Sequence, residues 1–219
     1  NNGLLIAAIL NKQAGYDPLK SFAPISTVTK VPMVLVVNKD VPAGSLREFI
    51  EYARSQPGRL NYATAGVASY GNLATSLLSQ AAGIRMTQVP YRGEAGTTMA
   101  VRTGEFQVLL TSPSSAMLGM VKEGHLKLLG VATPRRSELV PEAQPIAEVL
   151  PGFSSEIWFG LMAPAGTPPA IVDKLNAAVR QALDDTRIRA RLFASGAIAQ
   201  ASTPKAFQEL MTAEHAQFS

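Results

Sequence analysis

The chain has 219 residues, of which 47% are hydrophobic and 16% are charged. This length supports one large domain or two small ones, and the apolar content is too high for a disordered chain. The absence of cysteine excludes thiol catalysis, disulfides and thiolate metal sites, and the net charge of +4 comes from scattered positives that form no nucleic-acid footprint.

The first apolar run, residues 4–9, predicts a strand directly after Asn1-Asn2-Gly3. A buried strand at this point needs neighbours, and no signal-type sequence precedes it. We therefore expect a processed or N-terminally shortened chain. The run is far below the ~18 apolar residues of a membrane span.

From Val31 onward, short apolar strands alternate with capped helices. Val34-Leu35-Val36-Val37 is typical of a strand buried on both faces. Ser45 to Glu48 is a capping box, which opens a helix with Leu46, Phe49, Ile50 and Ala53 on one face. The units that follow are strand 60–64 with helix 70–82, strand 86–89 with helix 94–103, strand 106–110 with helix 114–123, and strand 126–132. This alternation predicts an α/β fold, with a mostly parallel sheet and helices on both faces.

The last third begins with a predicted strand over 157–163. Thr167-Pro168 then opens a helix that ends at Asp184. The residues expected to face inward from this helix are Ile171, Leu175, Ala178, Val179 and Ala182. Helices over 186–195 and from Thr203-Pro204 onward complete the chain.

Two crossovers, near 30–32 and near 154–158, divide the predicted elements. We expect residues 32–156 to form an inserted α/β domain. Residues 1–31 and 157–219 are expected to form a discontinuous outer domain that lacks its N-terminal part.

Enzyme motifs have little support. The sequence has no Walker A or GxGxxG pattern, and His125 and His215 have no metal-ligand neighbours, so we expect no cofactor, no metal and no catalytic residue. Residues 66–71 resemble a nucleophile elbow, but Ala68 stands where glycine is needed. A hydrolase-like enzyme that uses Ser69 or Tyr91 is kept as the alternative.

Loops rich in hydroxyls and glycine join three strands to the helices that follow them. In an open parallel sheet such loops meet at one edge, where ligands bind. Amides at helix N-termini together with hydroxyl donors suit a carboxylate or phosphate, although the same residues also serve as helix caps. The candidate ligand-binding residues are Thr64, Ala65, Gly66, Ser69, Tyr70, Tyr91, Gly93, Thr111 and Ser112. Trp158 is a further candidate, for stacking on a ligand or for core packing.

An ordered set of motifs resembles one family. The segment YDPLKSFAPI from Tyr16 resembles YDPxKDFxPI, VPYRG from Val89 resembles VPYKG, and WFGLMAPAGTP from Trp158 resembles WFGLLAPAGTP. These motifs are those of the substrate-binding proteins of tripartite tricarboxylate transporters, the Bug-type periplasmic receptors. The resemblance covers nearly the whole chain.

The resemblance implies a two-lobed receptor of the periplasmic-binding-protein type, hinged at its two crossovers. We expect each lobe to be a mostly parallel sheet flanked by helices. Such a receptor closes on a small organic carboxylate in the periplasm and presents it to membrane subunits. We expect a monomer that binds no nucleic acid. A ligand-sensing module that delivers nothing to a transporter stays open as a further alternative.

Two positions depart from the family pattern. Asn72 stands where the family often has histidine, and Thr111 where it often has aspartate. An uncharged threonine removes the partner of an amino group, and burying an unpaired ammonium is costly. These departures favour a carboxylate ligand without an amino group.

Overall fold

The computed structural model describes residues 1–11, 13–66, 69–91 and 93–218. The chain divides into two compact units. The two-segment unit comprises Asn1–Val31 and Ile157–Ser219, and the continuous unit comprises Pro32–Glu156. The chain therefore passes between the units at 31–32 and again at 156–157.

The continuous unit is the alternating α/β part that the sequence predicts. Its elements are β2 (Val34–Asn38), α2 (Leu46–Ser55), β3 (Asn61–Thr64), α3 (Tyr70–Ala82), β4 (Thr87–Pro90), α4 (Gly93–Arg102), β5 (Val108–Thr111), α5 (Ser115–Lys122), β6 (Leu126–Val131) and the short 3-10 helix η1 (Ile146–Glu148).

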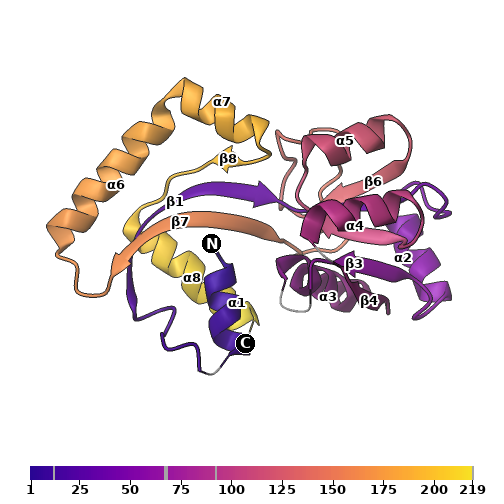
Figure 1. Cartoon of the computed structure of the whole chain (residues 1–219), viewed down its shortest axis with the longest axis horizontal. Coiled ribbons are helices and arrows are strands. Elements are labelled where there is room, and N and C mark those ends of the chain that lie inside the picture. Colours follow the sequence, from indigo (N-terminus) through magenta and orange to yellow (C-terminus); the bar gives the residue numbers. More distant parts are fainter. Residues whose placement is uncertain (12, 67–68, 92, 219) are drawn as a thin grey trace. The chain divides into compact units, whose positions relative to one another are not determined.

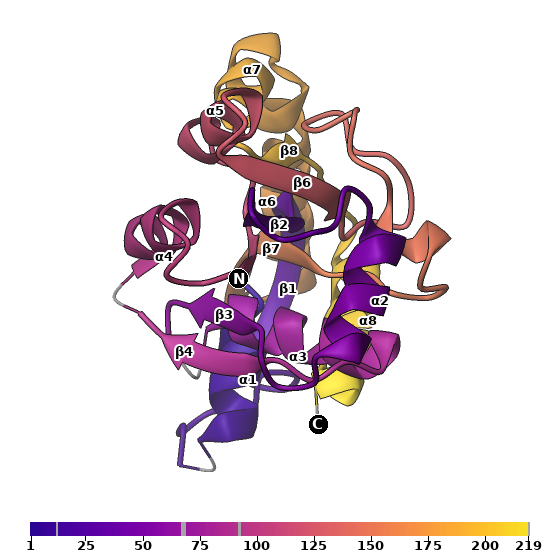
Figure 2. The same cartoon turned by 90° about the vertical axis from the view of Figure 1, so that its right-hand side faces the viewer.

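The sheet of this unit has the strand order β4-β3-β5-β2-β6. β3 pairs in parallel with β4 and β5, whereas β2 is antiparallel to β5 and β6. Figure 2 shows β3 and β4 side by side. Because β5 and β6 both oppose β2, every strand of this sheet except β2 runs in one direction.

β2 lies inside the sheet, and all of its residues are buried. Val34 and Val36 belong to a core cluster that also contains Phe106, Leu109 and Val131. A strand that is covered on both faces needs apolar side chains at consecutive positions, which explains the unbroken run at 34–37.

The capping box at the start of α2 forms as the sequence predicts. Ser45 Oγ accepts a hydrogen bond from the Glu48 amide, and Glu48 Oε2 accepts one from the Gly44 amide at 2.7 Å. The predicted apolar face, made of Leu46, Phe49, Ile50 and Ala53, is buried. Capping and amphipathic periodicity therefore determine this helix together.

The two-segment unit combines a small sheet with helices. Its elements are α1 (Gly3–Leu10), β1 (Phe22–Pro32), β7 (Glu156–Pro164), α6 (Pro169–Asp184), α7 (Thr186–Ala194), β8 (Ile198–Ala199) and α8 (Pro204–Phe218). The sheet order is β7-β1-β8.

The expectation of a mostly parallel sheet is wrong for this unit. β1 and β8 are antiparallel, and the arrows of β1 and β7 point in opposite directions in Figure 1. The reason is the chain path: β1 leads the chain out of the unit and β7 leads it back. The sequence pattern also predicts no strand at β1 or β8, and both are present.

The strand expected over residues 4–9 is instead the helix α1. Its sequence, GLLIAAIL, is dominated by leucine and alanine, which favour a helix more than a strand, and short apolar runs do not separate the two. Leu5 joins a core cluster with Trp158, Phe207 and Met211. α1 packs against α8, and Figure 1 shows the two helices side by side.

The predicted inward face of α6 is also wrong. Ile171 is 50% exposed, and the buried residues of the helix are Val172, Asn176 and Leu183. Asn176 Nδ2 donates to the carbonyls of Ile25 and Ser202, both at 2.7 Å. The buried Asn176 amide satisfies one carbonyl of a strand and one of a loop, and this requirement determines which face of the helix turns inward.

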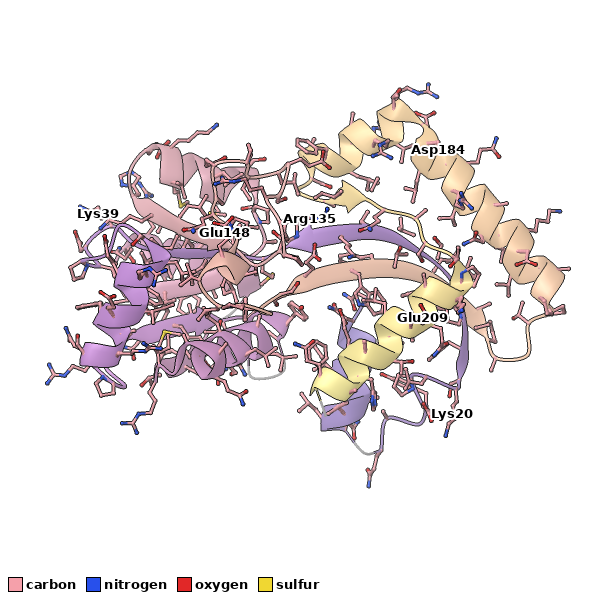
Figure 3. All side chains as sticks on the ribbon, turned by 180° about the vertical axis from the view of Figure 1, so that it is seen from behind. Lys20, Lys39, Arg135, Glu148, Asp184 and Glu209 are labelled. Atoms are coloured by element: carbon pink, nitrogen blue, oxygen red, sulfur yellow. The ribbon has the colours of Figure 1, made fainter. Side chains whose placement is uncertain are left out.

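Charged side chains lie on the outside of both units. Lys20, Lys39 and Asp184 are exposed, and Figure 3 shows them projecting from the ribbon. Among the described residues, no helix is long and apolar enough to cross a membrane.

Gly160 of β7 provides a test of the packing in the two-segment unit. A Cβ atom at this position would lie 2.6 Å from Phe207 Cε1 and closer still to Cζ. Because the Phe207 side chain is fully buried, we expect Gly160→Ala to lower the free energy of unfolding by about 1–3 kcal/mol in urea titrations.

Gly119→Ala is the matched control. Gly119 lies within α5, and a Cβ atom there meets no atom within 4 Å. This change should leave stability unchanged or raise it by up to ~1 kcal/mol. Equal stability of the two variants would contradict the packing of Phe207 on β7.

Candidate functional site

The predicted loop edge exists in the continuous unit. Thr64, Pro90 and Thr111 are the last residues of the parallel strands β3, β4 and β5, and Thr64 pairs with Pro90. The helices α3, α4 and α5 begin just beyond these strand ends. The described parts of the connections that follow these strands, residues 65–66, 69–70, 91 and 112–115, therefore begin at one edge of the sheet, as expected for an open parallel sheet.

Two of the predicted ligand hydroxyls make hydrogen bonds within the fold, Ser69 as donor and acceptor and Thr64 as acceptor. Ser69 Oγ donates to the Gly66 carbonyl at 2.7 Å and accepts from the Asn72 amide at 3.3 Å, so Ser69 caps α3. Thr64 Oγ1 accepts from Gln88 Nε2 at 3.0 Å and from the Gly66 amide at 3.4 Å. These side chains shape the first loop.

Tyr70, the first residue of α3, has its hydroxyl bonded away from the loop. Tyr70 Oη donates to the Glu156 carbonyl at 3.0 Å and accepts from Ser155 Oγ at 3.1 Å. A phenol has a single proton to donate, and here it is committed to the backbone. Tyr70 thus serves as an anchor of the helix start.

Thr111 and Ser112 are different. Within the described parts of the chain, neither side-chain oxygen has a hydrogen-bond partner. Thr111 is only 7% exposed. Every fully buried side-chain oxygen in the described residues has a hydrogen-bond partner, and Thr111 Oγ1 has none, so this hydroxyl must be accessible to solvent. Ser114 Oγ caps α5 by accepting from the Met117 amide, which leaves Ser112 free of that duty.

Tyr91 presents a third hydroxyl with no partner among the described residues. Its ring is 37% exposed and packs edge-on against Phe106, with ring centroids 5.7 Å apart. On the other side, a Cβ atom at Gly96 would lie 2.8 Å from the ring. Glycine at this position of α4 therefore makes room for Tyr91, whose amide donates to the Thr64 carbonyl at 2.7 Å.

The remaining loop candidates are small residues. Ala65 and Gly93 are exposed and Gly66 is half-buried, so their backbones are accessible at the edge. Val67, Ala68 and Arg92, which fall within the predicted loops, lie outside the described residues. The structure therefore does not bear on the elbow-like comparison at Ala68.

The described side chains of these loops are uncharged. Residues 64–66, 69–70, 91, 93 and 111–115 consist of hydroxyl, small and apolar types. No group of three or more histidine, aspartate or glutamate side chains that could hold a metal occurs in the described part of the chain. Among the described residues of these three loops, the donors are thus hydroxyls and first-turn amides of helices, which suit an anion.

Trp158 belongs to the core of the two-segment unit. It is 1% exposed, lies edge-on to Phe207 with centroids 5.0 Å apart, and its Nε1 donates to Glu214 Oε2 at 2.8 Å. A ring that is covered on all sides offers no face to a ligand, so Trp158 packs in the core and the expectation of ligand stacking is wrong.

The edge also extends to the end of β6, where the sequence predicts no ligand-binding residue. Val34 of β2 pairs with both Thr111 and Val131, so the end of β6 reaches the same edge. The loop after β6 contains Thr133, whose Oγ1 donates to the Arg135 carbonyl at 2.6 Å, and the exposed Arg135 side chain (Figure 3). Only the reversed direction of β2, which a local pattern does not reveal, places this loop here.

The comparisons with known proteins agree on one family. The family model described as the tripartite tricarboxylate transporter family receptor matches residues 4–216. A curated relative from Pseudomonas sp. (strain P51), a UPF0065 protein of the tcbD-tcbE intergenic region, is 29% identical over 98% of this chain.

Two solved structures from Rhodopseudomonas palustris are similar along most of the chain. Rpa4515 with adipate has a TM-score of 0.79 at 31% identity, and covers 94% of this chain and 69% of its own. MatC with bound malate has a TM-score of 0.78 at 33% identity, and covers 97% of this chain and 74% of its own.

The chain belongs to the tripartite tricarboxylate transporter receptor family. The family resemblance and the two-lobed α/β class inferred from the sequence are confirmed, and the matching family model describes a transporter receptor. The chain spans between 54% and 64% of the length of the first curated relatives that it matches.

The core position of Trp158 predicts a stability effect. Trp158→Phe removes the hydrogen bond to Glu214 and leaves a gap beside Phe207, so the free energy of unfolding should fall by about 1–3 kcal/mol. Phe159→Leu is the control, because Phe159 is adjacent but 46% exposed, and surface changes usually stay within ~0.5 kcal/mol. Chemical denaturation followed by circular dichroism measures both. A Trp158→Phe variant as stable as the native chain would contradict this core assignment.

Proposed function

We propose that the continuous unit binds a small organic carboxylate at the edge where β3, β4 and β5 end. The residues that would contact the anion are Tyr91, Thr111 and Ser112, together with backbone amides near Ala65, Gly66 and Gly93. Thr64 and Ser69 would shape the first loop, and Tyr70 would hold the start of α3.

The observation that carries this proposal is the hydroxyl of Thr111. It sits at the end of a buried strand, reaches solvent and has no partner in the described structure. A polar group kept accessible in an otherwise buried side chain can donate to a ligand without breaking an internal bond. Such a donor, placed among helix N-termini, favours an anion.

The relatives indicate the class of anion. The solved relatives carry adipate and malate, which are both dicarboxylates without an amino group. The uncharged Thr111 suits such ligands, because threonine offers no carboxylate to pair with an ammonium. We therefore propose a dicarboxylate of similar size as the ligand class.

Binding without turnover is proposed over catalysis. Ser69, the candidate nucleophile, donates its proton to the Gly66 carbonyl and caps α3, and its partners include no histidine or carboxylate. An activated serine needs a base within hydrogen-bond reach. A receptor of this kind would act as a monomer in the periplasm and deliver its ligand to the membrane subunits of a tripartite tricarboxylate-type transporter.

Calorimetry tests the proposal directly. Titration of the chain with malate, adipate, citrate and acetate should show stoichiometric heat for at least one dicarboxylate and no product on prolonged incubation. At a ligand concentration of 100 times Kd, the bound state should gain about 2.7 kcal/mol of stability. Sulfate serves as the anion control. Binding of none of the organic acids, or equal binding of sulfate, would contradict a carboxylate site.

Thr111→Asp is the sharper substitution. It places a negative charge where the ligand carboxylate is expected, and like charges at ~4 Å repel by several kcal/mol at a partly exposed site. The Kd for the bound dicarboxylate should rise by about 100-fold or more. Thr111→Asn, which is similar in size but neutral, should change Kd by less than about tenfold. If the two variants bind equally well, Thr111 does not face the carboxylate.

A further inference from the structure

The start of α3 is tied to the segment through which the chain leaves the continuous unit. Tyr70 Oη donates to the Glu156 carbonyl and accepts from Ser155 Oγ. Glu156 is the last residue of the continuous unit. A side chain that begins a helix at the candidate edge therefore contacts the crossover directly.

Ser155 extends this connection to the other crossover. Its amide donates to the Ala132 carbonyl at 2.8 Å, and its carbonyl accepts from the Met33 amide at 3.3 Å. Met33 directly follows Pro32, the first residue of the unit, and its own carbonyl accepts from Ala132 at 2.7 Å. Both passages of the chain into and out of the unit thus converge on Ser155.

A second tyrosine holds the same helix turn from the sheet. Tyr62 Oη, on β3, donates to Asn72 Oδ1 at 2.9 Å. The first turn of α3 is therefore fixed from two directions, by Tyr62 from the sheet and by Tyr70 from the crossover. Only the second of these connections reaches the boundary between the units.

We propose that Tyr70 is a positioning residue that couples the start of α3, at residues 69–73, to the crossover at residues 155–156. The consequence of this coupling for binding rests on the proposed function. A carboxylate bound at the edge would stabilise one arrangement of the crossover through the Tyr70 hydroxyl. The coupling itself is a property of the chain without ligand. It also assigns the Tyr70 hydroxyl a role other than contact with the ligand.

The physical basis is the position of the two hydrogen bonds. Ser155 is almost fully buried, so a change in its backbone requires its hydroxyl to move with it or to lose its partner. The partner is the first residue of α3, directly after the Ser69 cap that ends the loop. The Tyr70 hydroxyl thus links the conformation of residues 155–156 to the conformation at the start of α3. Coupling between two sites requires such a shared group.

Hydrogen exchange on the ligand-free chain tests the coupling. Ser155→Ala should raise amide exchange on the order of tenfold at residues 69–73, far from the substitution in sequence, because Tyr70 loses a hydrogen-bond partner. Combined with Tyr70→Phe, Ser155→Ala should cause no further increase there. Exchange in α2 should not change in either variant, which separates coupling from general loss of stability. Additive effects, or no effect of Ser155→Ala on residues 69–73, would overturn the proposal.

Tyr62→Phe is the matched control variant. It removes a tyrosine hydroxyl that donates to the same helix turn from β3. Amide exchange should rise at residues 69–73, while exchange at residues 155–157 stays unchanged. Tyr70→Phe should raise exchange at both places. If Tyr62→Phe also loosens residues 155–157 to the same extent, the route through Tyr70 is wrong.

A ligand arm with malate separates this inference from the proposed function. Where malate slows amide exchange at residues 69–73 of the native chain, it should also slow exchange at residues 155–157. In Tyr70→Phe, malate should still slow exchange at residues 69–73 but no longer at residues 155–157. Retained protection at 155–157 in Tyr70→Phe would overturn the coupling. If the native chain binds none of the organic acids, the proposed function fails, and the ligand-free comparison still decides the coupling.

Discussion

The parallel pairing of β3 with its neighbours β4 and β5 is the constraint on which the candidate site depends. Parallel strands bring their carboxyl ends to one edge, and each of these strands is followed by a loop and a helix start. Backbone amides in the first turn of a helix have no partner within the helix, so an edge with several such turns is suited to an anion before any side chain contributes. The unbroken apolar run of β2 supports this arrangement, since it fills the centre of the sheet.

Within that edge, the hydroxyl groups divide according to what the fold needs. Ser69 and Ser114 are spent on helix caps, and Thr64 holds Gln88, whereas Thr111 and Tyr91 have no partner in the described structure. A cap uses the hydroxyl oxygen as an acceptor, so it is the further bond from Ser69 to the Gly66 carbonyl that uses the single proton of that hydroxyl. From the sequence, Thr64, Ser69, Tyr91 and Thr111 are equal candidates, and only their hydrogen bonds distinguish them. The described donors after β3, β4 and β5 are neutral, whereas the loop after β6 adds the exposed, charged Arg135 side chain at the same edge.

The aromatic residues show how position decides role. Trp158 looks like a ligand platform in the sequence, but the buried pair with Phe207 and the bond to Glu214 make it a core residue. Tyr91 keeps its ring partly exposed because Gly96 leaves space for it. Tyr70 reaches away from the loop to a residue more than eighty positions further along the chain, a partner that no local pattern identifies.

Local rules were enough for much of the continuous unit. The capping box at Ser45, the apolar face of α2 and the alternation of strands with helices follow from side-chain periodicity and turn chemistry, and the ordered motifs identify the family. What the sequence could not determine depends on contacts between distant residues. Residues 4–9 form a helix because they pack on α8. The helix α6 turns Asn176 inward because two distant carbonyls need its amide. The strands β1 and β7 oppose each other because the chain leaves the two-segment unit through β1 and returns through β7. The choice between cap and ligand donor was likewise left to the tertiary structure, because a hydroxyl's role depends on the partner that folding brings to it.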